Sequence, residues 1–144
     1  MTPALSPDGR WLAYASFEAG SYQVFVRPFP GPGGRTQISV RGGLAPSWSA
    51  DGRELFFLTQ TDAQNQQRYM MRVDVALEPT PVVGRPARMF EWDHVISTPV
   101  RRYDVASDGR FLIAVAEDLD TVPRGHVRLI DSWAGTLVER VPAR

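Results

Sequence analysis

The stretch PALSPDGRWLAYAS, Pro3 to Ser16, has the pattern of a tight turn that leads into an apolar strand. It recurs twice in altered form, as PSWSADGRELFFLT from Pro46 to Thr59 and as YDVASDGRFLIAVA from Tyr103 to Ala116. The Asp-Gly-Arg triplets at positions 8, 51 and 108 are 43 and 57 residues apart. The first spacing is typical of a four-stranded propeller blade, which repeats every ~40–45 residues. The second indicates one blade with an insertion.

Local chemistry accounts for the repeated turn. Proline presets φ for a type I turn, aspartate bonds to the nearby backbone, and glycine takes the left-handed conformation that closes the hairpin with a bulge. Because each aspartate lies in the same turn of a different repeat, we expect them to stay apart and not to form a carboxylate pair or a metal site. The turn residues are Asp8, Gly9, Asp51, Gly52, Asp108 and Gly109.

Each repeat shows the same order of strand patterns. A short run precedes the turn, at Pro3–Ser6, Ala45–Ser49 and Arg102–Ala106. An apolar run follows it, at Trp11–Ser16, Glu54–Thr59 and Arg110–Ala116, and its continuous apolar character predicts strands buried on both faces. A β-branched and aromatic run comes next, at Tyr22–Arg27, Arg68–Val75 and His126–Asp131. The fourth strands are expected at Gly34–Val40 and Ala87–Trp92, and Ser132–Arg140 is either a strand or a short helix.

Composition limits the class of protein. The 144 residues suffice for one domain, and 16 basic residues, all of them arginine, balance 16 acidic ones, which argues against a nucleic-acid partner. The absence of cysteine excludes disulfides and thiolate metal sites. The sequence contains no run of ~18 apolar residues, so we expect no contact of this segment with a membrane. The first ten residues do not resemble a signal peptide.

The three repeats resemble the WD-like repeats of TolB-type β-propellers. The resemblance is closest to the C-terminal propeller of bacterial membrane-anchored serine/threonine protein kinases, above all in Ser6 to Phe57 with its segment VRPFPGPGG. It covers the last three blades of what is usually a six-bladed domain. The Gly-rich loop, H-R-D and D-F-G motifs of a kinase domain do not occur in the chain. The resemblance therefore implies an extracytoplasmic sensor domain if the chain is part of a receptor kinase, and otherwise leaves its location open.

The expected fold is therefore all-β, with three four-stranded blades that form half of a six-bladed ring. The blades are expected at residues 1–43, 44–98 and 99–144. Three blades leave two apolar faces open, which a monomer rarely tolerates. We therefore expect a homodimer that closes the ring, because six blades fall within the ~4–8 blades of known propellers and nine do not.

No catalytic or cofactor site emerges from the sequence. The chain contains no G-x-S-x-G nucleophile motif, and His94 and His126 lack the spacing of metal ligands. The residues expected to bind a ligand lie on the first strands, which line the channel of a propeller. Arg101, Arg102 and Tyr103 offer bidentate donors beside an aromatic ring, suited to an acidic peptide or a carboxylate, and a solvated arginine pair is the alternative. Trp48 is a candidate for the same surface, or a packing residue.

The predicted function is a non-catalytic interaction or sensor module that binds a protein or small ligand and self-associates. Two alternatives stay open at this point. The chain could be an accessory propeller that gates the substrate of a hydrolase, or a structural, self-assembling propeller fragment. Neither needs a cofactor.

Overall fold

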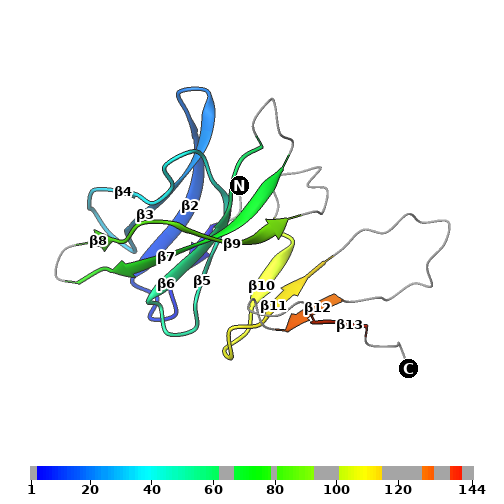
Figure 1. Cartoon of the computed structure of the whole chain (residues 1–144). Helices are drawn as coiled ribbons and strands as arrows, with labels where there is room; N and C mark the ends of the chain where they lie inside the picture. Colours follow the sequence, from blue (N-terminus) through cyan, green and yellow to red (C-terminus); the bar gives the residue numbers. More distant parts are fainter. Residues whose placement is uncertain are drawn as a thin grey trace.

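The computed structural model describes residues 3–61, 67–78, 81–92 and 101–114, and the backbone of two further strands at 128–131 and 137–140. These residues form three antiparallel sheets in chain order, as the blue, green and yellow-to-red strands of Figure 1 show. The first sheet has the order β1 (Ala4–Leu5), β2 (Trp11–Glu18), β3 (Ser21–Pro28), β4 (Thr36–Gln37). The third has the order β10 (Tyr103–Val105), β11 (Phe111–Ile113), β12 (Arg128–Asp131), β13 (Leu137–Arg140).

The second sheet contains one strand more than the four expected. It runs β5 (Leu44–Trp48), β6 (Glu54–Leu58), β7 (Arg68–Ala76), β8 (Val82–Val83), and β9 (Ala87–Trp92) also pairs with β7. The fourth position is therefore divided between β8, beside the end of β7, and β9, beside its start. The connection between β8 and β9 contains Gly84 and Pro86, and a proline cannot donate to a sheet ladder, which explains the division.

The end of the third sheet resolves the alternative left by the sequence. Leu137–Arg140 pairs in antiparallel register with β12, so this segment is a strand and not a short helix. Gly135, just before it, disfavours a helix at this point. No helix in the described part of the chain is long and apolar enough to span a membrane.

The second sheet lies between the other two and is covered on both faces. Its β6 buries four successive side chains, as predicted from its continuous apolar run. By contrast, β2 alternates between buried and half-buried residues. The difference arises because one face of the first sheet packs against the second sheet, whereas no other sheet of the described residues lies on its other face. The expectation that β2 is buried on both faces therefore does not hold in this arc of three sheets.

Two apolar clusters join the sheets. The first, between the first and second sheets, consists of Ala4, Trp11, Ala13, Val24, Val26, Ile38, Trp48, Leu55, Phe57, Val73 and Val75. The second lies mainly between the second and third sheets and consists of Ala15, Leu44, Ala45, Phe56, Leu58, Met70, Trp92, Tyr103, Phe111 and Ile113. Strand β6 contributes alternate side chains to the two clusters, so it forms the centre of the core.

Candidate functional site

The three repeated turns have the predicted structural role. In each, the glycine N–H donates to the carbonyl oxygen three residues earlier, at 2.9, 3.0 and 2.9 Å. The glycine φ angles are +72°, +71° and +84°, which only glycine adopts without strain. Each aspartate accepts a hydrogen bond of 3.1 Å from the N–H of the arginine two residues later. The aspartates therefore stabilise turns in separate sheets, and two of them, Asp8 and Asp51, border the same groove.

A serine completes the turn in the first two repeats. The Ser6 hydroxyl donates to Asp8 at 2.6 Å and accepts from the Trp11 N–H at 2.9 Å. Ser49 makes the same two bonds, to Asp51 at 2.7 Å and from the Glu54 N–H at 2.9 Å. These serine bonds are the main cause of the lowered pKa of both carboxyl groups.

The third turn has Ala106 where the others have serine, and its hairpin is one residue shorter. The Ala106 N–H donates to the carbonyl oxygen of Arg110, four residues later, whereas in the first two turns this bond spans five residues. A slip of one residue moves alternate side chains to the opposite face of a strand. As a result, Phe111 and Ile113 face the second sheet, although their repeat equivalents on β6 face the third sheet. Here the lowered pKa of Asp108 comes mainly from the Arg110 N–H.

Two aromatic side chains connect neighbouring sheets by hydrogen bonds from their polar atoms. The Trp48 indole N–H donates to the carbonyl oxygen of Ala4 at 3.0 Å, across the first boundary. The Tyr103 hydroxyl donates to the carbonyl oxygen of Ala45 at 2.7 Å, across the second. In both cases a residue on the first strand of one sheet bonds to the first strand of the preceding sheet.

A bulge in β5 explains the bond of Tyr103. The register of β5 against β6 shifts between Leu44 and Ser47, and Ala45 lies there with a φ of +52°. Pro46 is fully buried beside it and has no N–H to donate to the ladder. The bulge leaves the Ala45 carbonyl oxygen outside the ladder, and the hydroxyl of Tyr103 supplies its partner. Burial raises the pKa of Tyr103 well above its usual range, so the hydroxyl keeps its proton.

The predicted ligand residues fall into two groups. Arg101 and Trp48 line a hollow of about 300 Å³ on the first strands, together with Pro3, Leu5, Asp104 and Val105 among others. The first strands of all three sheets thus border one concavity. The Arg101 guanidinium also reaches the Ser47 hydroxyl at 3.3 Å and lies 3.9 Å from the Asp104 carboxylate.

Tyr103 lies elsewhere, because it is only 4% exposed and belongs to the core between the second and third sheets. Its ring and hydroxyl are occupied by protein contacts, so it acts as a packing residue. Trp48 is also buried, at 6% exposure, and presents little of its ring to the hollow. Arg102 is half-buried and does not line the hollow. A ligand-binding role for the arginines stays a prediction.

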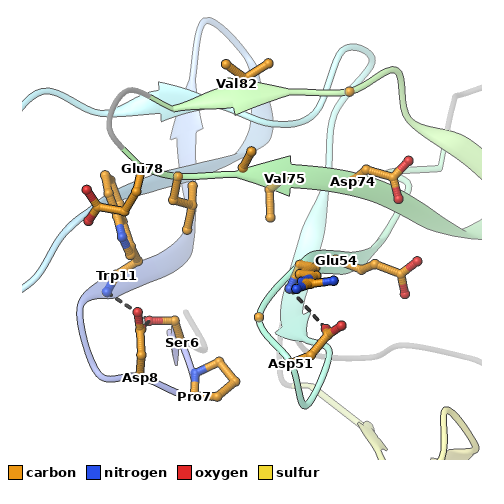
Figure 2. A pocket seen from close by; sticks show the side chains of 15 residues that line it. Ser6, Pro7, Asp8, Trp11, Asp51, Glu54, Asp74, Val75, Glu78 and Val82 are labelled. Carbon is orange, nitrogen blue, oxygen red and sulfur yellow. Dashed lines mark hydrogen bonds between the residues drawn. The ribbon is translucent and has the colours of Figure 1, made fainter.

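A larger groove of about 1230 Å³ lies between the turns of the first and second sheets. Figure 2 shows the Asp8 and Asp51 turns on opposite sides, with Val75 between them and Glu78 beside Trp11. The Arg10 guanidinium lies 2.6 Å from Glu78, so an ion pair connects the two sheets at this groove. Sequence reasoning missed this groove, because Asp8 and Asp51 were expected to stay apart in separate turns, and Glu54, Asp74 and Glu78 belong to no repeated motif.

Within the residues that the structure describes, no group of three histidine, aspartate or glutamate side chains is placed to hold a metal ion. The two histidines, His94 and His126, lie outside the described residues.

Comparisons with known proteins bear on the fold. No protein-family model and no curated protein matches the chain. The structure of a putative TolB from Agrobacterium tumefaciens superposes on 97% of this chain with a TM-score of 0.62 and 18% sequence identity. TolB from Acinetobacter baumannii covers the same share at 18% identity, with a TM-score of 0.48.

The likeness to the Agrobacterium protein confirms the predicted fold class, an all-β propeller of TolB-like architecture. Because the sequence identity is 18%, this likeness shows the fold alone. The chain spans about half the length of that structure, since the match covers 49% of it. A partial propeller is therefore the architecture of this chain, and each sheet is one blade.

Proposed function

We propose that this chain is a non-catalytic protein-interaction module that self-associates to close a propeller ring. The non-catalytic role is supported by the three repeated aspartates, whose carboxylates are all engaged in turns. The self-association is supported by the partly exposed apolar side chains on the outer face of the first blade.

That outer face is the observation on which the proposal rests. In the middle blade, Leu55 and Phe57 point toward the preceding blade and are 0% and 2% exposed. Their repeat equivalents in the first blade are Leu12 and Tyr14, which are half-buried. Leu5, paired with Leu12 in the sheet, is 49% exposed. Among the described residues, the first blade therefore carries partly exposed apolar side chains on the face that corresponds to the covered face of the middle blade.

A second copy of the chain is a suitable neighbour on geometric grounds. Two arcs of three blades related by a two-fold axis make a ring of six, and three arcs would make nine, beyond the usual ~4–8. Closure also places the hollow at Arg101 inside a channel, where a peptide or carboxylate ligand would meet two copies of it. The resemblance of Ser6 to Phe57 to kinase-linked propellers adds a sensor role outside the cytoplasm to the proposal.

The test is the mass of the chain in solution. One chain has a mass of 16.1 kDa, so light scattering after size-exclusion chromatography is expected to give a particle of about 32 kDa. Image averages of this particle should show six blades around a channel. A folded monomer across the micromolar range would contradict the proposal.

A further inference from the structure

The groove between the turns of the first two blades is acidic, although the chain as a whole carries no net charge. Among the described residues that line it, one, Arg53, is basic and five are acidic: Asp8, Asp51, Glu54, Asp74 and Glu78. Arg10 lies 2.6 Å from Glu78 and neutralises it. Arg72 lies 3.3 Å from Glu54. Three carboxylates and one guanidinium remain, so the groove keeps a local excess of negative charge.

A comparison of the three repeated turns shows that two of these carboxylates are free to meet a partner. In the third turn, Arg110 neutralises Asp108, with its Nε 2.7 Å from the carboxylate oxygen Oδ2. In the first two turns, Asp8 and Asp51 each use Oδ1 for both of their turn bonds. Their Oδ2 atoms therefore have no bond to any residue that the structure describes. The two aspartates without an ion pair are the two at the groove.

The turns hold these two carboxylates in fixed positions. The lowered pKa of Asp8 and Asp51 keeps both ionised at neutral pH. Figure 2 shows them on the two turns that flank the groove, whereas the carboxylates of Glu54 and Asp74 point away from the Asp8 turn. Glu54 and Asp74 are cross-strand partners, and strand alternation turns Asp74 to the face opposite the buried Val75. A group bound in the groove would thus contact the two turn aspartates and experience the other two only through their field.

The surface between the turns is apolar. Val75 lies between them in Figure 2, Trp11 lies on the side of the first blade, and the half-buried Leu77 packs against the core. A volume of about 1230 Å³ is much larger than one amine or metal ion fills, and it exceeds the ~300–1,000 Å³ of typical small-molecule sites. An extended peptide segment fits such a groove, because its basic side chains can reach the aspartates while an apolar side chain covers the surface between them.

We propose that this groove binds a basic segment of a partner protein, in which two arginine or lysine side chains, on either side of an apolar one, pair with Asp8 and Asp51. The proposal rests on the protein-interaction role inferred above, and it gives that role a surface and a partner chemistry. It does not depend on self-association, because residues of one chain form the groove.

A capped peptide, Gly-Arg-Leu-Arg-Gly, is the probe, titrated into the full chain and followed by the backbone amide NMR signals. The signals of Gly9, Gly52 and Val75 should shift, and the affinity should fall as salt rises. Two exposed ion pairs and one partly buried leucine predict a dissociation constant on the order of 1 mM. Replacing the leucine of the peptide by glycine should weaken binding about 5-fold.

Charge variants of the chain test the two contacts. Asp8→Asn and Asp51→Asn keep an oxygen that can accept the turn bonds, and each should weaken binding about 5-fold. Asp108→Asn makes the same change in the turn outside the groove, so it is the matched control and should leave the affinity unchanged. Arg53→Gln removes the opposing guanidinium and should strengthen binding about 3-fold, a gain that a purely structural role would not produce. Circular dichroism confirms that each variant is folded.

Several results would overturn the proposal. A dissociation constant above about 10 mM would do so, as would equal losses from Asp51→Asn and Asp108→Asn. Equal affinity for the capped peptide Gly-Glu-Leu-Glu-Gly would exclude charge recognition, and equally tight binding of spermidine would show a general cation site in place of a peptide site. The mass of the chain is measured in the same samples. A monomer that binds the basic peptide would refute only the self-association, and a dimer that does not bind it would refute only the groove.

Discussion

The hydrogen bond between Tyr103 and the bulge of β5 makes a sharp prediction about stability. Tyr103→Phe removes a single oxygen atom and retains the ring. That ring packs edge-on to Trp92 at 5.9 Å between centroids and lies 6.1 Å from Phe111. The change therefore isolates the bond to the Ala45 carbonyl oxygen from the packing of the core.

The magnitude follows from the position of the acceptor. The Tyr103 hydroxyl lies 2.7 Å from the Ala45 oxygen and 3.2 Å from the Phe56 oxygen, and all three residues are buried. A buried acceptor left without a partner costs about 1–3 kcal/mol, so the free energy of unfolding should fall by about that amount. For a chain of this size the melting temperature should fall by about 4 °C for each kcal/mol.

The assay is urea denaturation followed by circular dichroism, at one fixed protein concentration because self-association would add to the measured stability. The matched control is Tyr69→Phe, which removes an exposed hydroxyl bonded to Gln67 at 2.8 Å and should change stability by less than about 0.5 kcal/mol. Equal effects of the two substitutions would refute the argument that the bulge depends on Tyr103.

Two further predictions concern the turns. Ala19 and Gly20 join β2 to β3, and their φ angles are +48° and +87°. Because Asn-Gly suits such a turn, Ala19→Asn should raise the free energy of unfolding by about 0.5–1 kcal/mol in the same urea titration. The control is Ala50→Asn, where φ is not positive and no gain is expected. The pKa of Asp51 lies below its ordinary value of 3.8 in the fold, so its stabilising effect is present above that value and is lost as the pH falls through the folded pKa. Ser49→Ala removes the main cause of that shift. The difference in the free energy of unfolding between wild type and variant should therefore become smaller from pH 7 to pH 3. A difference that stays constant would show that the hydrogen bond to the Asp51 carboxylate does not account for the effect of Ser49.

Much of the fold could be predicted because the repeated signals are local. Proline, aspartate and glycine act within four residues of one another, so the turns at positions 8, 51 and 108 could be recognised without knowledge of the rest of the chain. Strand positions followed from them, and the end of each strand was predicted to within a few residues in the first blade. The third hairpin, in which alanine stands at position 106 in place of serine, is one residue shorter, and no local pattern predicted the resulting facing of β11.

The candidate site was less predictable. Arg101, Arg102 and Tyr103 are adjacent in sequence, which favoured a single binding surface. The structure separates them, with Arg101 at the hollow on the first strands and Tyr103 in the core between two blades. The reason is that Arg101 precedes β10, whereas Tyr103 lies on it and bonds to a bulge in a strand more than fifty residues away. No local pattern reveals that bulge.

The sequence by itself thus determined the elements that arise from short-range interactions: the hairpin turns, the order of strands and the number of blades. The tertiary structure alone decided which strand faces are covered, that Tyr103 completes the ladder of another blade, and that carboxylates from separate strands border one groove. These features depend on contacts between residues far apart in the chain. Their energies come from burial and from satisfying buried backbone groups, and both exist only once the blades have packed.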